Sequence, residues 1–437
     1  MRLLNTRTLE LEYFPKGDKP PYAILSHTWG TEEVLFEDAR HGSAKLRACP
    51  KRGLDKVTKS AELALSDGYD YVWIDTCCID KSSSAELSEA INSMFAWYRQ
   101  SDVCYAFLED YTHGRSDLAD SRWFTRGWTL QELIAPFDVR FYDSSWSMFG
   151  DRLQLSSTIA KITSVDHHVL SFTFTPQALC TNGKGHPLPA PTEFGDTTCH
   201  ICRETTLTLL FQSYSVSTKM SWAARRETTR VEDVAYCMMG IFGVNMPLLY
   251  GEGGKAFRRL QEEIVRRSND QTILAWRREM FSGEDLLQSS RSSIFASHPA
   301  QFRSGNSFHP IRAHMSRHSI NHSSAGMEMD VHLVPCKFYS PDADIRSPNL
   351  GAQAGEAWLA VLNCSYKNDI FSSPALLLGK MDSDHKFCRR CFEHPFSRCQ
   401  YVIVSEGRKS CEFLAEAPYP DLSNSLQRSK RQNYCQL

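Results

Sequence analysis

Short apolar runs that end in polar residues alternate with helical patterns in the first third of this chain. Tyr22-Ala-Ile-Leu-Ser26 and Tyr71-Val-Trp-Ile-Asp75 each lead directly into a polar cluster, and residues 103–108 and 139–142 supply two further strand candidates. Continuous apolar runs of this length are typical of strands buried on both faces of a parallel sheet. The alternation therefore predicts an α/β domain with a doubly wound, mainly parallel sheet.

Helical periodicity occupies the intervals between these strands. The apolar positions of residues 54–65 fall on one stripe, and Gly68 follows them as a C-terminal stop. Ser83 and Glu86 have the spacing of a capping box, and the helix that they begin carries an apolar face as far as Tyr98. A shorter helix is expected within residues 121–134.

The composition and the hydrophobic periodicity of the sequence change after this first region. Residues 171–217 are rich in Thr, Pro and Gly without a sustained period, which predicts a long loop or irregular insertion. Helical periodicity resumes at Val231 and again after Gly254, and strand-like alternation appears from Met327 onwards. The expected limits are 1–165 for the α/β domain with its core at 22–145, 166–218 for an insertion or linker, 219–276 for a helical segment, 277–325 for a linker, and 326–425 for a mostly β C-terminal region.

Composition excludes several classes of protein. Hydrophobic residues make up 42% and charged residues 23%, and the formal net charge is −2, so no global field favours nucleic acid or an anionic membrane. No stretch approaches the roughly 20 apolar residues of a membrane-spanning helix, and the N-terminus lacks the apolar region of a secretory signal. The 15 cysteines are then expected to be reduced thiols in the cytoplasm. Two Cys-x-x-Cys pairs lie too far apart in sequence to favour a zinc site: Cys199/Cys202 and Cys388/Cys391.

Several segments in order resemble the fungal heterokaryon-incompatibility (HET) domain family. They are Tyr22–Gly30, Tyr71–Lys81, Glu86–Asp110 and Arg122–Leu133, followed by Met220–Tyr236 and Gly240–Gly253, which resemble the segment that commonly follows the domain. The resemblance implies a role in non-self recognition that triggers regulated cell death, through self-association or another incompatibility protein. Relatives usually join the two parts by a short connection; a genuine insertion and an unspliced intron would both explain residues 171–217.

The HET domain is similar in element order to Toll/interleukin-receptor (TIR) domains, which have a flavodoxin-like sheet. Some TIR domains cleave the nicotinamide–ribose bond of NAD with the glutamate of a Trp-x-x-x-Glu arrangement. Trp128 and Glu132 have that spacing, so the resemblance implies a catalytic Glu132, with NAD as substrate and no cofactor. The alternative is that Glu132 pairs with Arg122 or Arg126 while Trp128 belongs to the core. The corresponding functions are a TIR-like NAD glycohydrolase and a signalling module without turnover.

Ligands of a doubly wound sheet bind beyond the carboxyl ends of its strands, which points to the polar clusters described above. His27 and Trp29 could line a nucleotide pocket or be held locally in a turn. Asp75 and Asp80 could bind ribose hydroxyls or cap the helix that begins near Ser83. The candidate substrate-binding residues are Ser26, His27, Trp29, Gly30, Asp75, Asp80 and Trp128. The thiols of Cys77 and Cys78 lack an identifiable His partner, which favours packing over nucleophilic chemistry.

Overall fold

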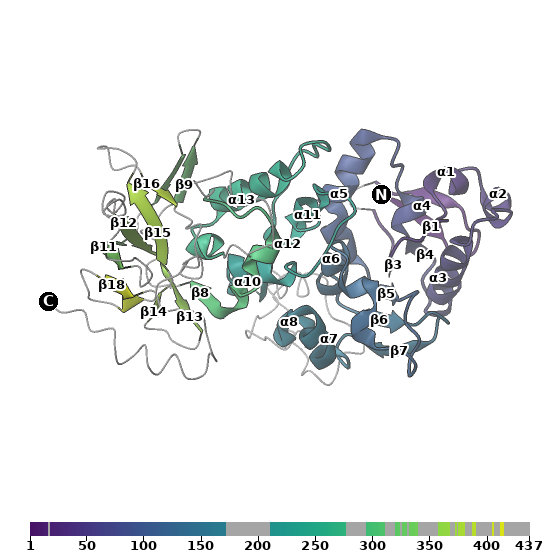
Figure 1. Cartoon of the computed structure of the whole chain (residues 1–437). Coiled ribbons are helices and arrows are strands. Elements are labelled where there is room, and N and C mark those ends of the chain that lie inside the picture. Colours follow the sequence, from purple (N-terminus) through teal and green to yellow (C-terminus); the bar gives the residue numbers. More distant parts are fainter. Residues whose placement is uncertain are drawn as a thin grey trace, which may run out of the picture. The chain divides into compact units, whose positions relative to one another are not determined.

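A computed structural model describes residues 1–15, 18–171, 210–276, 294–310, 320–323, 326–329, 332–339, 357–367, 372–373, 375–380, 387–389, 404–405 and 411–414 (Figure 1). The chain forms two compact units. The first holds Met1–Tyr214 and Arg225–Leu260, and the second holds Ser215–Ala224 and Gln261–Leu437. The domain limits expected from the sequence remain predictions.

The first unit is built on a seven-stranded mixed sheet with the order β2-β1-β4-β3-β5-β6-β7. Its four central strands, β4, β3, β5 and β6, are parallel, whereas β1, β2 and β7 pair in antiparallel fashion at the edges. The strands are β1 (Arg2–Asn5), β2 (Leu11–Tyr13), β3 (Ala23–His27), β4 (Tyr71–Trp73), β5 (Val103–Phe107), β6 (Val139–Tyr142) and β7 (Met148–Asp151). The predicted α/β class is confirmed, with antiparallel edges that were not predicted.

The parallel strands arise where the apolar runs predicted them. Every residue of β3 and β5 is buried, because both strands lie inside the sheet with layers on either face. The second strand is shorter than predicted: β4 ends at Trp73, and Asp75 begins the short helix α4 (Asp75–Cys78). Asp75 therefore sits at the first turn of a helix rather than at the end of a strand.

The longer helices follow their apolar stripes. Helix α3 (Leu54–Ser66) ends at Gly68 as predicted, where a φ of +88° requires a residue without a Cβ and the Gly68 amide donates to the Leu65 carbonyl at 3.1 Å. Helix α5 (Ser84–Gln100) starts with the Ser83 side chain accepting from the Glu86 amide. The predicted capping box is only half formed, since the Glu86 carboxylate accepts from the Asp80 amide at 2.9 Å.

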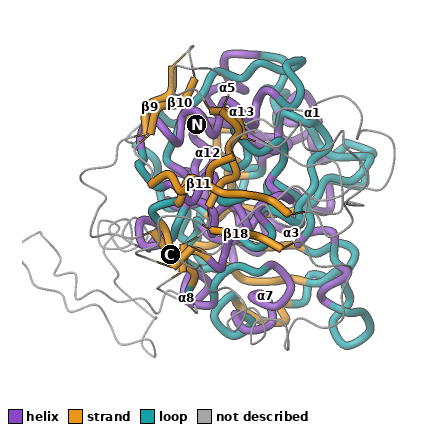
Figure 2. Tube along the Cα trace, turned by 60° about the vertical axis from the view of Figure 1, so that its left-hand side comes forward, coloured by secondary structure: helices purple, strands orange, loops and turns teal. Residues whose placement is uncertain are grey.

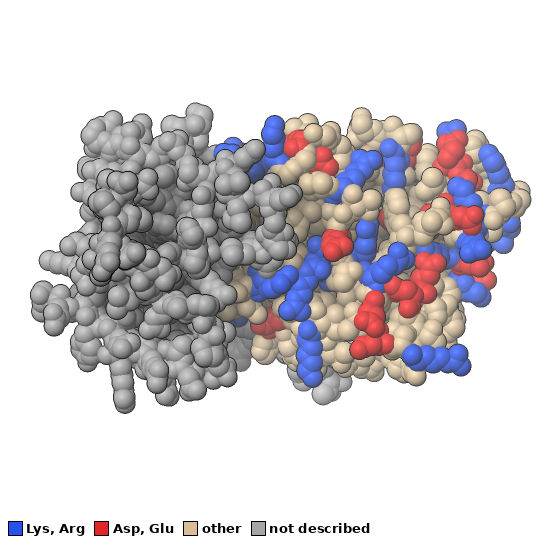
Figure 3. Space-filling view, in the orientation of Figure 1, with Lys and Arg blue, Asp and Glu red and all other residues tan. Residues whose placement is uncertain are grey.

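Shorter helices complete the first unit. They are α1 (Phe36–Ala39), α2 (Ser43–Arg47), η1 (Leu118–Asp120), η2 (Arg122–Phe124), α6 (Thr129–Ile134), α7 (Ser156–Thr163), α8 (His167–Ser171), α11 (Asp233–Tyr236) and α12 (Met239–Phe242). The periodicity after Val231 thus forms two short helices, α11 and α12. On the face shown in Figure 3, acidic and basic side chains of the described residues are interspersed, as the balanced composition predicts.

The second unit contains helical turns and strands. Its helices are α10 (Val216–Trp222), the part of α13 (Lys255–Arg267) beyond Leu260, η3 (Gln271–Leu274), η5 (Pro299–Phe302) and η6 (Gly305–Ser307). Helices α8 and α10 occupy the two ends of the range 166–218, so the expectation of irregular structure is wrong there; residues 172–209 lie outside the described residues. The helix predicted after Gly254 is confirmed by α13, in which Arg259 pairs with Glu252.

Every described element beyond residue 307 is a strand. One five-stranded sheet has the order β16-β15-β12-β11-β18, in which β11 and β18 are parallel neighbours. Both of these strands are labelled in Figure 2. Three two-stranded sheets accompany it, β10-β9, β13-β8 and β14-β17. The bounds are β8 (Phe308–Pro310), β9 (Ile320–Ser323), β10 (Gly326–Met329), β11 (His332–Tyr339), β12 (Ala357–Val361), β13 (Cys364–Tyr366), β14 (Ser372–Ser373), β15 (Ala375–Lys380), β16 (Phe387–Arg389), β17 (Val404–Ser405) and β18 (Cys411–Leu414).

Candidate functional site

Ser26 and Glu132 meet at the carboxyl end of β3. The Ser26 hydroxyl donates to Glu132 Oε2 at 2.5 Å, and the Trp123 indole Nε1 donates to Ser26 Oγ at 2.9 Å. Ser26 is the next-to-last residue of β3, and Glu132 lies in the first turn of α6. The strand end and the helix start therefore place a hydroxyl and a carboxyl group in direct contact, across 106 residues of sequence.

The environment of Glu132 favours its neutral form. Only 7% of the residue is exposed, and burial raises the pKa of its carboxyl group to about 8, with a further contribution from the negative charge of Asp75. Hydrogen bonds with Ser26 and Tyr98 and the positive charge of Arg226 act in the opposite direction. A carboxyl group with a pKa near neutrality inside a protein is a feature of catalytic sites, although buried structural networks show it too.

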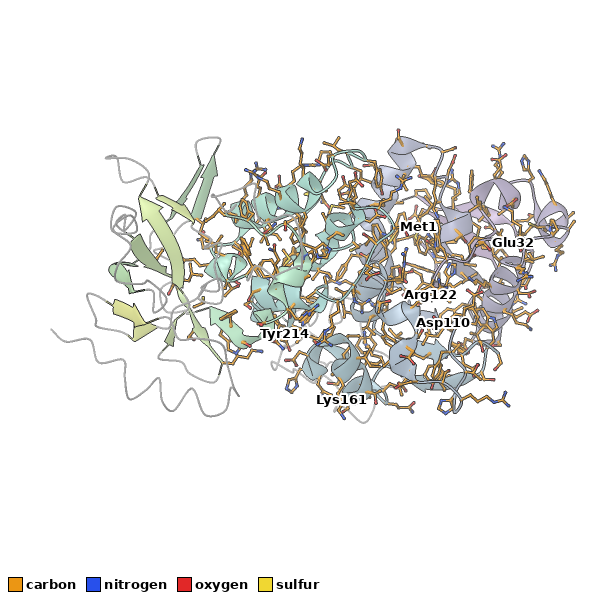
Figure 4. The ribbon with its side chains drawn as sticks, viewed as in Figure 1. Met1, Glu32, Asp110, Arg122, Lys161 and Tyr214 are labelled. Atoms are coloured by element: carbon orange, nitrogen blue, oxygen red, sulfur yellow. The ribbon has the colours of Figure 1, made fainter. Side chains whose placement is uncertain are left out.

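The arginines proposed as alternative partners of Glu132 lie elsewhere. The Arg122 amide donates to Asp110 Oδ2 at 2.9 Å, and its Nε lies 3.5 Å from the same oxygen; both residues are labelled in Figure 4. Arg126 Nη1 donates to Thr229 Oγ1 at 3.0 Å. The interpretation of Glu132 as an ion-pair partner of Arg122 or Arg126 is therefore wrong.

A second cluster surrounds Asp75. His27 Nε2 lies 3.1 Å from Asp75 Oδ1, and Trp29 Nε1 donates to Asp75 Oδ2 at 2.9 Å. The Lys81 ammonium lies 4.0 Å from Asp75 Oδ2 and 3.5 Å from the centroid of the Trp29 ring. Burial alone would raise the pKa of Asp75, but Lys81, His27 and Trp29 together lower it to about 2. Asp75 is thus ionised beside an indole that is 44% exposed.

Two predicted site residues, Asp80 and Trp128, form hydrogen bonds with residues outside the contact between Ser26 and Glu132. The Asp80 carboxylate accepts from the amide and hydroxyl of Ser82 at 2.9 and 2.6 Å, so it stabilises the turn before α5, whereas Ser83 is the N-cap of that helix. The Trp128 indole donates to Asp233 at 3.4 Å. Neither side chain joins the hydrogen bonds of Ser26 and Glu132.

The Gly30 amide takes part in an ionic network beside His27, in which Glu33 and Lys56 are buried. Its amide donates to Glu33 Oε1 at 2.6 Å, and Lys56 Nζ lies 2.6 Å from the same oxygen and 3.1 Å from Glu109 Oε2. His27 Nδ1 is 3.9 Å from Glu33 Oε1. Glu33 and Lys56 were not predicted as site residues, although Glu33 follows Gly30 by three residues.

The adjacent cysteines are packed rather than reactive. Cys77 and Cys78 are buried, and the neighbouring Cys78 thiol together with burial raises the pKa of Cys77 well above its usual value. The Cys104 thiol is likewise buried, and burial raises its pKa. Thiols held neutral in this way are poor nucleophiles, which favours the packing interpretation.

Neither a metal site nor a membrane-spanning helix is found among the described residues. Among them, no group of three or more His, Cys, Asp and Glu side chains has a geometry that could hold a metal ion. No helix within the described ranges is long and apolar enough to cross a bilayer. Both Cys-x-x-Cys pairs lie outside the residues whose side chains are described.

Comparison with known proteins adds relatives to this geometry. Residues 22–116 match the family described as "Heterokaryon incompatibility protein (HET)", and residues 255–383 match a domain of unknown function (DUF8212). Over 264 residues the chain is 42% identical to "Vegetative incompatibility protein HET-E-1" of Podospora anserina, a match that covers 57% of this chain and 16% of that relative. No solved structure matches the chain. Ser26 and His27 at the end of β3 and Asp75 at the start of α4 all lie within the matched residues. This chain therefore carries a domain of the heterokaryon incompatibility (HET) family.

Proposed function

We propose that this protein acts in heterokaryon incompatibility in a fungus and triggers regulated cell death by cleaving NAD in the cytoplasm, with Glu132 as the catalytic carboxylate. The observation that carries the proposal is the direct contact between Ser26 and Glu132 at the carboxyl end of β3. The order β4-β3-β5-β6 of the parallel strands is consistent with a doubly wound, TIR-like fold. In such a fold, this edge of the sheet is where a nucleotide binds.

The chemistry requires an anion near the ribose. When the bond between the nicotinamide nitrogen and ribose C1′ breaks, its electron pair leaves with nicotinamide, and C1′ becomes oxocarbenium-like. The Glu132 carboxylate would stabilise that centre until water adds to C1′ and releases a proton. The raised pKa does not prevent this role, because the positive charge of the bound nicotinamide ring favours the ionised carboxylate.

The remaining side chains have roles that follow from their contacts. The Ser26 hydroxyl orients the carboxylate of Glu132, and the exposed face of Trp29 offers a stacking surface for a base. Asp75, already ionised, would accept from ribose hydroxyls, with His27 holding it in place. The hydrogen bonds of Asp80 with Ser82 and of Trp128 with Asp233 leave both residues outside the proposed contacts, and the Gly30 amide donates to Glu33 instead.

A second function is favoured by the burial of Glu132. A carboxyl group that is 7% exposed and satisfied by internal hydrogen bonds also serves a purely structural purpose. In that case the domain would signal without turnover, by self-association or by docking to another incompatibility protein.

The two functions are separated by the variant Glu132→Gln, which keeps the size and an acceptor for Ser26 but cannot ionise. Purified protein at high concentration would be incubated with NAD, nicotinamide release followed, and toxicity scored in a fungal host. The enzymatic function predicts that Glu132→Gln loses both. Glu232→Gln is the matched control, since Glu232 is also buried but accepts from the amides of Gly251 and Gly253. Absence of nicotinamide release by the wild type, with toxicity preserved in Glu132→Gln, would falsify the enzymatic function and support the docking function.

A further inference from the structure

Arg226 is a buried arginine that the proposed chemistry does not use. It is 4% exposed and belongs to the segment Arg225–Leu260 of the first unit. Its Nη1 donates to the Arg126 carbonyl at 2.7 Å and to Thr129 Oγ1 at 2.8 Å. Both acceptors lie at the start of α6, the helix that carries Glu132.

The rest of the Arg226 guanidinium is unsatisfied. Its Nε and Nη2 are buried and have no hydrogen-bond partner among the described residues. Buried donors of a charged group are costly unless an opposite charge compensates them. Cys237 and Glu132 are the acidic groups whose charges interact with Arg226, and burial raises the thiol pKa of Cys237, which therefore stays neutral. Glu132 remains as the group that can supply the negative charge.

We propose that Arg226 is a positioning residue for Glu132, which holds the carboxyl group at the start of α6 and stabilises its ionised form. The catalytic meaning of this assignment rests on the proposed function, whereas the interaction itself exists with or without NAD cleavage. Glu132 itself lies beyond residues 22–116, which match the HET family, and the site then also requires the later segment Arg225–Leu260.

The later segment is built into the backbone next to Arg126. The Gly127 amide donates to the Glu227 carbonyl at 2.8 Å, and the Glu227 amide donates to the Thr125 carbonyl at 2.6 Å. A Cβ on Gly127 would lie 2.5 Å from Thr228 Cγ2, so the segment around Gly127 and the segment around Thr228 approach each other as closely as glycine permits. Arg226 is thus held in register with α6 by main-chain hydrogen bonds.

Several groups besides Arg226 set the ionisation of Glu132. Asp75 at the start of α4 disfavours the ionised form, while Ser26 on β3 and Tyr98 on α5 favour it by hydrogen bonding. The Cys104 thiol on β5 also interacts with the Glu132 charge, but burial raises its pKa and keeps it neutral. Arg226 supplies the positive charge in this set, so its removal is expected to raise the pKa of Glu132 further.

A double-mutant cycle on the full chain tests the assignment. The melting temperature would be measured from pH 5 to pH 10 for the wild type, Arg226→Gln, Glu132→Gln and the double variant. In the wild type, the melting temperature should change with pH as Glu132 ionises, and Glu132→Gln should abolish this transition. In Arg226→Gln, the midpoint of the transition should lie at a higher pH. In the Glu132→Gln background, Arg226→Gln should cause no such shift. Arg126→Gln is the control, because the Arg126 side chain binds Thr229 and should leave the midpoint unchanged.

The outcomes are distinct. An unchanged midpoint, or the same shift in both backgrounds, overturns the proposal. Should Arg226→Gln fail to fold, Arg226→Lys retains the charge but not the planar fork, and a smaller upward shift is expected; no shift overturns the proposal. If the wild type cleaves NAD, Arg226→Gln should lower kcat by about tenfold or more with little change in KM, and Arg226→Lys should restore part of it. If the wild type cleaves no NAD, the proposed function fails while the thermal cycle still decides the role of Arg226.

Discussion

Ser26 forms hydrogen bonds with two buried polar groups at once. Its hydroxyl donates to Glu132 and accepts from the Trp123 indole. We expect Ser26→Ala to lower the free energy of unfolding by about 1–3 kcal/mol, because the buried Trp123 indole would lose its hydrogen-bond acceptor and the buried Glu132 carboxyl group would lose one of its hydrogen bonds. Urea denaturation monitored by tryptophan fluorescence measures the loss.

A matched serine separates this effect from the removal of any buried hydroxyl. Ser60 is equally buried, but its hydroxyl bonds only to the Lys56 and Val57 carbonyls of its own helix, α3. Those carbonyls keep their helical hydrogen bonds in Ser60→Ala, so a loss below about 0.5 kcal/mol is expected. Equal losses in the two variants would show that the Ser26 hydroxyl has no special role.

The raised pKa of Glu132 makes stability depend on pH in a defined direction. The unfolded carboxyl group ionises near its usual value of 4.5, whereas the folded group ionises near pH 8. Its contribution is therefore fully present below about pH 4.5 and is lost as the pH rises through about 8. Glu132→Gln should gain stability relative to the wild type between these limits, as measured by melting temperature; curves that stay parallel would contradict the raised pKa.

At the scale of elements, Gly240 on α12 faces α5. A Cβ on Gly240 would lie 2.1 Å from Phe95 Cβ, so Gly240→Ala must displace one helix from the other. We expect a loss of about 1–3 kcal/mol in the free energy of unfolding. Gly254→Ala is the control, because nothing lies within 4 Å of its added Cβ. An unchanged stability of Gly240→Ala would contradict the close packing of α12 on α5.

The elements that could be predicted are those with a strong local signal. The four parallel strands follow from continuous apolar runs, and α3 follows from its stripe and from Gly68, whose positive φ ends the helix. The edge strands β1, β2 and β7 are short and incompletely buried, so their sequences carry no such run. Helix α4 was missed because four residues are too few to show a helical period.

The site could be predicted in part for the same reason. Ser26, His27 and Asp75 end or follow parallel strands, and strand ends of one direction meet at one edge of a sheet. Asp80 shows the limit of that rule, since a local hydrogen bond to Ser82 holds it in a turn. The indole of Trp123 and the guanidinium of Arg226 reach the site through packing between segments distant in sequence, which no local pattern encodes.

At the scale of the whole molecule, two segments that are separated in sequence form the first unit. Residues up to Tyr214 form most of that unit, and Arg225–Leu260 returns to it after α10. The return is fixed by several hydrogen bonds, among them two between the Asn92 side chain and the backbone of Met246, each 3.2 Å long and joining residues 154 positions apart. A segment tied in this way should unfold with the sheet rather than with its own neighbours in sequence.

Hydrogen exchange under native conditions tests that expectation. The amides of Gly127 and Glu227, which bridge the two parts of the first unit, should open with the same free energy and the same denaturant dependence as amides in β3 and β5. Amides near the C-terminus of α13, beyond Leu260, should instead follow the second unit, because a helix can fray or open on one side of a unit boundary. If the Glu227 amide exchanged with the second unit, or well before the sheet, Arg225–Leu260 would not be part of the first folding unit, and Arg226 would lose the rigid support that its proposed role beside Glu132 requires.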